Sequence, residues 1–320
     1  MKNWTYWRNN RNVHNITTYI CYELTNLALA QSDQALLNWL SPLEPWKRHS
    51  EIRSTRLLGS GTWVTEGNTY MRWSSEQSAS QILCCYGSPG AGKTFIAYVS
   101  TLKTSLSLAN ILLYRCLVID TLEKIRNTMS NIGLAYVYCD YQDRREQTEE
   151  HIIGAIVKQL LEQLPTIPEE ITEIWMKSGR GKRRPERPEL TEVKDALRTT
   201  CNSFDRTYIC LDALDEFEGY RDLFDFFWNL LRECKSIRLF ITCRSHVKDF
   251  VWSKYRENVC FVRIEAKDSD IGMLIKERII DDRKKDSNIM NDKLQKSIIE
   301  KVSALAEGMF VLTSSTIKLY

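Results

Sequence analysis

Residues 87–94 read Gly-Ser-Pro-Gly-Ala-Gly-Lys-Thr and directly follow an apolar run at residues 82–86. The pattern G-x-x-x-x-G-K-[ST] between a strand and a helix is typical of a loop that wraps phosphate groups. Its glycines let backbone N–H groups turn inward, at φ/ψ values that side chains resist. Lys93 would reach the β- and γ-phosphates, and Thr94 would offer its hydroxyl to Mg²⁺. The motif predicts that a nucleoside triphosphate is bound by Gly87, Ser88, Pro89, Gly90, Ala91, Gly92, Lys93 and Thr94.

The bulk composition is that of an ordinary globular protein. Of its 320 residues, 43% are hydrophobic and 27% are charged, and the net charge of +3 is too small to indicate a nucleic-acid partner. The longest apolar stretch, residues 106–119, contains Arg115 and is too short to cross a bilayer. The first residues do not resemble a signal peptide. We therefore expect a cytoplasmic protein with neither a membrane nor a nucleic-acid partner.

The ten cysteines do not suggest a disulfide framework. None forms a C-x-x-C pair, and the four histidines do not cluster with them. We predict reduced, buried thiols, since cysteine inside an apolar run behaves as a small hydrophobic residue. The six cysteines in strand-like apolar runs are Cys84, Cys85, Cys139, Cys210, Cys243 and Cys260.

From residue 80 onward, apolar strands alternate with amphipathic helices, which predicts an α/β fold of the P-loop NTPase type. We expect a mostly parallel five-stranded sheet flanked by helices, with a helical N-terminal segment and a small helical C-terminal appendage. The expected strands are residues 81–86, 134–140, 207–212, 237–243 and 260–264. The expected helices are residues 93–105, 117–129, 149–163, 189–203, 220–234, 270–281 and 292–306.

The sequence also predicts that the chain is divided into four segments. They are a helical N-terminal segment (1–42), a lead-in segment (43–79), the NTPase core (80–265) and a helical subdomain (266–320).

Two further segments, residues 17–40 and residues 177–187, can be interpreted from their composition. In the N-terminal segment a helix over residues 17–40 is expected to end before Pro42 and Pro45, because proline cannot continue a helix. Residues 177–187 carry six basic side chains among glycines and prolines, which favours an exposed loop over a binding surface for phosphate or acidic partners.

A second motif follows the strand that ends at residue 212. Asp212 would hold Mg²⁺ through water, opposite Thr94, and the small Ala213 would leave room for the phosphates. Asp215 and Glu216 follow in a tight turn, where a carboxylate could orient or deprotonate an attacking water. The sequence does not separate these two as the base. An acidic loop that caps the following helix is the alternative for Asp212 as well as for Asp215 and Glu216.

Arg244 follows the next expected strand. It would emerge at the carboxyl edge of the sheet, where open α/β folds bind ligands. A guanidinium there would sense the γ-phosphate and stabilise the charge that develops during its transfer. The alternative is an exposed arginine at the start of a helix.

The order of the phosphate loop, residues 212–216 and residues 242–244 resembles the NACHT domain of STAND-class P-loop ATPases. More narrowly, it resembles the nephrocystin-like NACHT modules of fungal NOD-like receptors. The resemblance covers about residues 43–310. Its further supports are Trp46-Lys47-Arg48-His49 with Arg56, Gly59-Ser60-Gly61-Thr62-Trp63, Tyr138-Cys139-Asp140-Tyr141 and Gly308-Met309-Phe310.

The resemblance implies an ATP/ADP switch with Mg²⁺ and weak ATPase activity. In such proteins nucleotide exchange opens the module, which then oligomerises and signals to an N-terminal effector domain. The resemblance assigns phosphate and metal binding to Gly87, Gly92, Lys93 and Thr94, metal binding to Asp212, hydrolysis to Asp215 or Glu216, and nucleotide sensing to Arg244. The lead-in segment would pack over the base, with Trp63 as a candidate; a buried core tryptophan is the alternative.

The chain departs from this pattern in three places. Residues 99–115 are extra, and we hypothesise that they are a translated intron, which sequencing the transcript would test. The chain ends shortly after residue 310, before the expected winged helix, so a sensor domain is expected to be absent. Residues 1–40 are too short for a recognisable effector domain.

Two other functions remain open at this stage. One is a small-molecule or nucleotide kinase, for which residues 180–187 would be the basic lid over the γ-phosphate. The other is a truncated, non-signalling fragment that binds no nucleotide. Transfer of phosphate to an acceptor would indicate the kinase, and unchanged thermal stability of Lys93→Ala with or without Mg·ATP would indicate the fragment.

Overall fold

A five-stranded sheet with all strands parallel forms the centre of the computed structural model. The structure describes residues 33–54, 61–75, 79–87, 113–178 and 186–265, together with 267–270, 272, 273, 276 and 297. The strands are β1 (Ile82–Gly87), β2 (Ile132–Tyr138), β3 (Arg206–Asp212), β4 (Ile237–Arg244) and β5 (Val259–Arg263), in the order β2-β3-β4-β1-β5. All five expected strands are confirmed, within two residues at each end. The expected fold class, a parallel α/β sheet of the P-loop NTPase type, is also confirmed.

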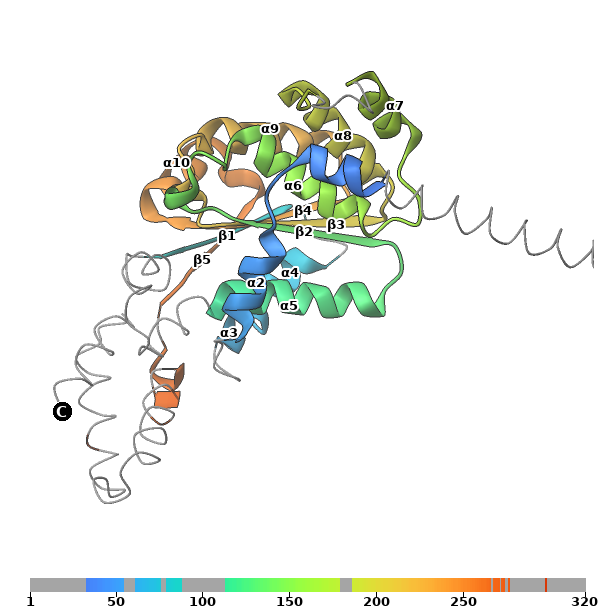
Figure 1. The fold of residues 1–320 in the computed structure, drawn as a ribbon. Helices are drawn as coiled ribbons and strands as arrows, with labels where there is room; N and C mark the ends of the chain where they lie inside the picture. The colour runs from blue at the N-terminus through green and yellow to red at the C-terminus, as the bar shows by residue number, and fades with distance from the viewer. Residues whose placement is uncertain are drawn as a thin grey trace, which may run out of the picture.

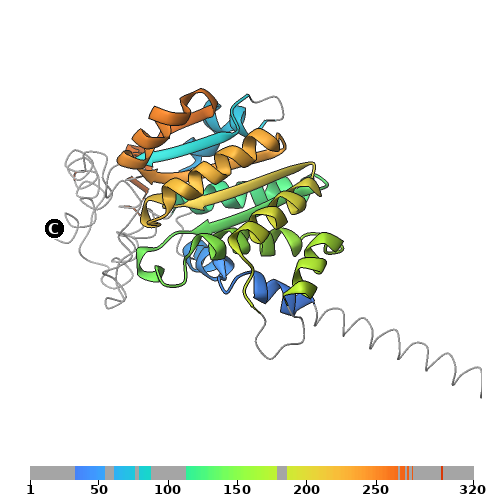
Figure 2. The same ribbon diagram turned by 90° about the horizontal axis from the view of Figure 1, so that it is seen from above.

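Helices cover both faces of this sheet (Figure 1). One face carries α6 (Glu149–Leu161), α8 (Leu190–Asn202), α9 (Tyr220–Glu233) and α10 (Ser245–Tyr255), with α7 (Glu169–Lys177) beside α8. The other face carries α2 (Pro45–Ser54), α3 (Thr62–Thr65), α4 (Asn68–Ser74) and α5 (Leu113–Thr128). Figure 2 shows the first group from above, lying over the strands. Three short 3₁₀ turns, η1 (Tyr141–Asp143), η2 (Leu214–Glu216) and η3 (Arg256–Asn258), complete the described elements.

Four of the expected helices correspond to α5, α6, α8 and α9. We did not predict α10, because its buried side chains, Val247, Val251 and Tyr255, form a narrow stripe with a spacing of four residues. We expected Pro45 only to follow the N-terminal helix. It also begins α2, where its fixed φ suits a first helical position. The expected helices at 93–105 and 292–306 and most of 270–281 lie outside the described residues, although residues 268–270, 272, 273 and 276 are helical.

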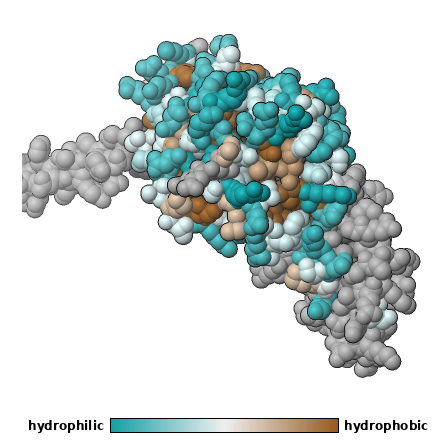
Figure 3. All heavy atoms as spheres, turned by 180° about the vertical axis from the view of Figure 1, so that it is seen from behind, coloured by the Kyte–Doolittle hydropathy of each residue, from teal (hydrophilic) through white to brown (hydrophobic). Residues whose placement is uncertain are grey.

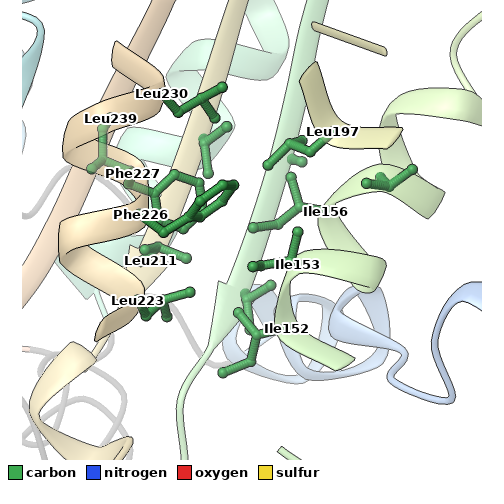
Figure 4. Close-up of a cluster of buried hydrophobic side chains, with 14 of the residues drawn as sticks. Ile152, Ile153, Ile156, Leu197, Leu211, Leu223, Phe226, Phe227, Leu230 and Leu239 are labelled. Atoms are coloured by element: carbon green, nitrogen blue, oxygen red, sulfur yellow. The ribbon is translucent and has the colours of Figure 1, made fainter. Parts of the chain in front are cut away.

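Side chains that alternate along each strand build two hydrophobic clusters, one on each face of the sheet. In β1, Ile82 and Cys84 belong to the larger cluster, whereas Leu83 and Cys85 belong to the smaller one. Figure 4 shows part of the larger cluster, where side chains from α6, α8 and α9 meet those of the strands. Both faces are apolar because the sheet is covered on both sides, which explains the nearly continuous apolar runs in the sequence.

The described part of the N-terminal segment packs into the larger cluster. Residues 33–40 are helical, and the rings of Trp39 and Trp175 of α7 lie 5.1 Å apart. The indole N–H of Trp39 donates a hydrogen bond to the carbonyl of Glu186, at the end of the basic loop. Gly154 of α6 lies directly against the carbonyl group of Leu40. The end of the N-terminal helix can approach α6 this closely because residue 154 has no side chain.

We expect Gly154→Ala to lower the free energy of unfolding by about 1–3 kcal/mol, the usual cost of overpacking a core. A Cβ atom at this position would overlap the backbone of Leu40, and a backbone moves less readily than a side chain. Urea denaturation measures the change, with Gly272→Ala as the control, because a Cβ atom there meets none of the described residues within 4 Å. Equal midpoints for the two variants would contradict the proposed close approach.

Strand β2 is an edge strand whose outward backbone groups are bonded to glutamine side chains. The side chain of Gln163 accepts from the N–H of Leu134 at 3.0 Å and donates to its carbonyl at 2.7 Å. Gln159 makes the same pair of bonds with Tyr136, at 3.2 and 2.9 Å. At the end of the strand Gln147 donates to the carbonyl of Tyr138 and accepts from the N–H of Asp140, both at 2.9 Å. These side chains satisfy backbone groups that a neighbouring strand would otherwise satisfy.

The described cysteines are free thiols, as we predicted, although Cys260, which we expected to be buried, is only partly buried. Burial raises the pKa of the Cys85 and Cys210 thiols well above the ordinary value and that of Cys201 to about 12. Burial and the neighbouring Cys243, whose sulfur lies 3.6 Å away, raise the pKa of Cys84. These thiols therefore stay protonated and unreactive near neutral pH.

The surface seen from behind is mostly hydrophilic, with smaller hydrophobic areas between the polar side chains (Figure 3). Among the described helices, none is both long enough and apolar enough to cross a membrane.

Candidate functional site

The predicted site residues that the structure describes gather at the carboxyl edge of the sheet. Because the strands are parallel, β1, β3 and β4 end at this same edge. Gly87, the first residue of the phosphate loop, is paired in register with Arg244 at the end of β4. Asp212 ends β3 and is paired with Tyr138 of β2. Residues 88–94 of the phosphate loop lie outside the described residues.

Asp212 is buried and its carboxylate is fixed by a threonine. The hydroxyl of Thr242, on the neighbouring strand β4, donates to Oδ1 of Asp212 at 2.5 Å. The same hydroxyl accepts from the backbone N–H of Ala213 at 2.8 Å. Only 3% of Asp212 is exposed, so this bond orients a carboxylate that has little contact with water. We assigned no role to Thr242 from the sequence; the available signal was a hydroxyl residue two positions before Arg244.

Ala213 adopts a left-handed conformation, with φ 51° and ψ 46°. A residue with a Cβ atom is disfavoured there by about 1–2 kcal/mol. The conformation turns the chain sharply after Asp212, and the N–H of Glu216 then donates to the carbonyl of Ala213 at 2.8 Å. Such strain is found at functional sites, where the surrounding structure holds it in place. Here it places both Asp215 and Glu216 within one short turn, η2.

Asp215 and Arg244 form an ion pair that joins η2 to the end of β4. The backbone N–H of Arg244 donates to Oδ1 of Asp215 at 2.9 Å, and its Nε lies 3.0 Å from Oδ2. The Asp215 side chain is 2% exposed and that of Arg244 is 36% exposed. Both oxygens of Asp215 therefore face one arginine, which leaves this carboxylate poorly placed to activate a water.

Glu216 points to a different place. It lines a cavity of about 460 Å³ together with Asp212, the start of α2, the end of β2 and η1. Neither Asp215 nor Arg244 is among the residues that line it. Two basic side chains, Lys47 and Arg48, line the cavity. The acidic side chains that line it are Glu44, Glu51, Asp140, Asp143, Glu146, Asp212 and Glu216.

The acidic side chains that line this cavity influence one another. Burial, with Asp140 and Glu146 nearby, raises the pKa of the Asp143 carboxyl. A space with this excess of carboxylates suits water or a cation and disfavours a polyphosphate. Gly87 and Arg244, where a phosphate is expected, are not among the residues that line this cavity.

Trp63 is partly buried and packs against the smaller hydrophobic cluster. Its indole N–H donates to Oδ2 of Asp270 at 3.3 Å, and the amino group of Lys267 lies 5.0 Å from its ring centre. Oδ1 of the buried Asp270 accepts from the N–H of Gly61 at 3.1 Å. These contacts favour the core tryptophan that we considered over a residue that packs on a base.

A sequence model of the family described as "Nephrocystin 3, N-terminal" matches residues 59–244, which is more than half of the chain. The chain belongs to this nephrocystin 3 N-terminal family. The match begins in the lead-in segment and ends at Arg244, so it contains the phosphate loop and all the candidate residues above. The family assignment confirms the nephrocystin-like resemblance and places a NACHT-like P-loop NTPase domain in the chain. No curated protein matches the chain significantly.

Several solved structures are also similar to this nephrocystin-like chain. The Orc1 protein of Aeropyrum pernix in complex with DNA is 15% identical, with a TM-score of 0.44, and the match covers 89% of this chain and 62% of that one. Drosophila ORC bound to DNA is 11% identical, with a TM-score of 0.35 and coverages of 71% and 51%. C. elegans PCH-2 is 10% identical, with a TM-score of 0.30 and coverages of 90% and 65%. The chain thus spans less than two thirds of each of these proteins.

Proposed function

We propose that the protein is an ATP/ADP-dependent regulatory switch with weak ATPase activity. The observation that carries this proposal is the position of Asp212, Glu216 and Arg244 at one edge of the sheet, beside the strand end where the phosphate loop begins. A carboxylate for a metal, a carboxylate next to water and a guanidinium for a phosphate are the groups that phosphoryl transfer to water requires.

The described residues are compatible with Mg²⁺ and a nucleotide. Mg²⁺ prefers oxygen ligands, and the buried carboxylate of Asp212 is held in place by Thr242. The phosphate loop, with Lys93 and Thr94, would complete the binding of phosphate and metal. The bound Mg²⁺ would neutralise the developing charge of the phosphates. Asp212 would orient the metal through water, and Glu216 would accept a proton from the attacking water.

The Asp215–Arg244 pair supports a switch rather than a plain hydrolase. Arg244 lies in register with Gly87, so a γ-phosphate bound there would compete with Asp215 for the guanidinium. Exchange between the two partners would link the nucleotide state to the position of η2 and of α9 behind it. A conformational change requires such a difference in contacts between the two states.

We place this switch in a cytoplasmic NOD-like receptor. By analogy with the family resembled, the ATP-bound core would associate with further copies of itself and pass a signal to an effector domain. This part of the proposal rests on the family assignment and on the fold, and the nucleotide-binding step is the one to test first.

The test is the amount of nucleotide retained by the purified chain. Wild type is expected to retain ADP, whereas Lys93→Ala is expected to retain none, because the lysine that binds the phosphates is lost. Denaturation followed by chromatography of the released nucleotide gives the amounts. Absence of nucleotide from wild type, with no change in thermal stability on adding Mg·ATP, would contradict the proposal. Stoichiometric transfer of phosphate to an acceptor would replace it with the kinase.

A further inference from the structure

A cluster of three side chains of metal-ligating types, two of them buried and one partly exposed, joins helix α2 to helix α5, outside the site described above. His49 belongs to α2, whereas Asp120 and Glu123 belong to α5. One ligand atom from each residue lies within 4.8 Å of the others. Asp120 and Glu123 are three residues apart in a helix, so both side chains leave the same face of α5. His49 is far from these two acidic residues in the sequence.

The imidazole of His49 is oriented for ligation. Only 4% of the residue is exposed, and its Nδ1 lies 2.7 Å from the hydroxyl of Tyr138. Its Nε2 lies 3.4 Å from Oδ1 of Asp120, but forms no hydrogen bond with the described residues. If Nε2 carried a proton for Asp120, a shorter and aligned contact would be expected. Placing the proton on Nδ1, where it bonds to Tyr138, leaves the lone pair of Nε2 facing the carboxylates.

The separation of these atoms fits one shared ion. Two ligands that each lie about 2.0–2.2 Å from a tetrahedral Zn²⁺ are about 3.3–3.6 Å apart. The distance of 3.4 Å between Nε2 of His49 and Oδ1 of Asp120 is within this range. We propose that His49, Asp120 and Glu123 form a binding site for one divalent cation of the zinc class. Glu123 is partly exposed and supplies the route to solvent, where water would complete the ligand set.

The types of ligand in this cluster distinguish it from the Mg²⁺ site expected at Asp212. Mg²⁺ prefers oxygen ligands and binds imidazole poorly, whereas imidazole suits Zn²⁺ and its neighbours in the first transition row. Asp212 offers only oxygen. The protein would therefore bind two different cations, one with the nucleotide and one without it.

Arg53 occupies the entrance to the cluster. Its Nε lies 3.7 Å from Oδ1 of Asp120, and its Nη1 lies 3.7 Å from Oε2 of Glu123. Its guanidinium offsets the charge of the two carboxylates in the absence of a metal. Because 61% of the Arg53 side chain is exposed, it can rotate into solvent when a cation binds. Arg53 and the cation would then compete for the same carboxylates.

A cation here would fix the lead-in segment on the NTPase core. The hydroxyl of Tyr138 bonds to His49. Tyr138 also lines the cavity that contains Glu216, here called the acidic cavity, and Arg48 and Ile52 of α2 line the same cavity. Joining α2 to α5 through a metal would restrict the wall of that cavity on the side of α2. The cation would thereby act on the space next to Glu216 without touching the nucleotide.

The experiment is calorimetric titration of the purified full chain with ZnCl₂, free of nucleotide. Wild type is expected to bind one Zn²⁺, and Glu123→Gln is expected to bind it at least about tenfold more weakly. Glu170→Gln, on α7, is the matched control and should bind like wild type, because its carboxylate is exposed and remote. Excess Mg²⁺ should not compete. Because no nucleotide is present, the outcome does not depend on the proposed switch.

Two further measurements distinguish this site from Zn²⁺ binding at cysteine thiolates or at scattered surface carboxylates. Arg53→Met is expected to bind Zn²⁺ more tightly than wild type, because the competing guanidinium is gone. Co²⁺ in the site should give weak d–d bands without a thiolate charge-transfer band, since no cysteine is a ligand. Equal affinity of wild type and Glu123→Gln, weaker binding by Arg53→Met, or a thiolate band would each overturn the proposal.

Discussion

Replacing Glu216 by glutamine is expected to lower the rate of ATP hydrolysis about 10²–10⁴-fold, the usual contribution of a general base. Glutamine keeps the size of the side chain but cannot accept the proton of an attacking water. Nucleotide binding should be retained, because the phosphates and the metal would be held by the phosphate loop and Asp212 rather than by Glu216. Single-turnover hydrolysis of radiolabelled ATP measures the rate, and equilibrium binding of a fluorescent analogue measures the affinity.

Glu218→Gln is the matched control for this variant. Glu218 lies two residues further along, is largely exposed, and pairs with Arg144. It should hydrolyse ATP like wild type. If Glu216→Gln kept the rate of wild type while a folded Asp215→Asn lost it, the roles of the two carboxylates would be reversed.

Asp215→Asn is expected to lower the free energy of unfolding by about 2–3 kcal/mol. Breaking a fully buried ion pair costs about 3–5 kcal/mol because one charge is left without its partner. The cost is smaller here, since Arg244 is 36% exposed and water can solvate part of its charge. Urea denaturation at neutral pH measures the change.

The chain provides a matched surface pair for comparison. Asp195 lies 2.8 Å from Arg198 but is 72% exposed. Asp195→Asn should change the free energy of unfolding by less than about 1 kcal/mol, because exposed pairs contribute little. A similar small effect for Asp215→Asn would show that Asp215 and Arg244 are not held together, and the proposed exchange of partners would fail.

The sheet could be predicted from the sequence because burial on both faces leaves a plain signal. Each strand is an apolar run bounded by polar residues, and helices with broad apolar faces, such as α9, separate the runs. The site at Asp212 and Arg244 could be predicted because functional residues follow strand ends in parallel sheets. Neither inference requires knowledge of which strands are neighbours.

What could not be predicted depends on contacts across the fold. Thr242 acts on Asp212 only because β4 lies beside β3, and nothing in the local sequence fixes that order. The choice between Asp215 and Glu216 depends on the left-handed turn at Ala213, where local propensity favours glycine. His49 reaches α5 through the packing of the lead-in helix, which the polar sequence of that segment does not indicate.

The glutamine side chains along β2 limit how copies of this protein can associate. An open edge strand recruits strands from other molecules, which leads to mixed sheets and to aggregation. Along β2 the outward-facing N–H and carbonyl groups of Leu134 and Tyr136, and the carbonyl of Tyr138, are already bonded within the chain. An incoming strand would have to displace several of these bonds at once before it gained its own. Association of copies of this protein is therefore not expected to extend the sheet across β2.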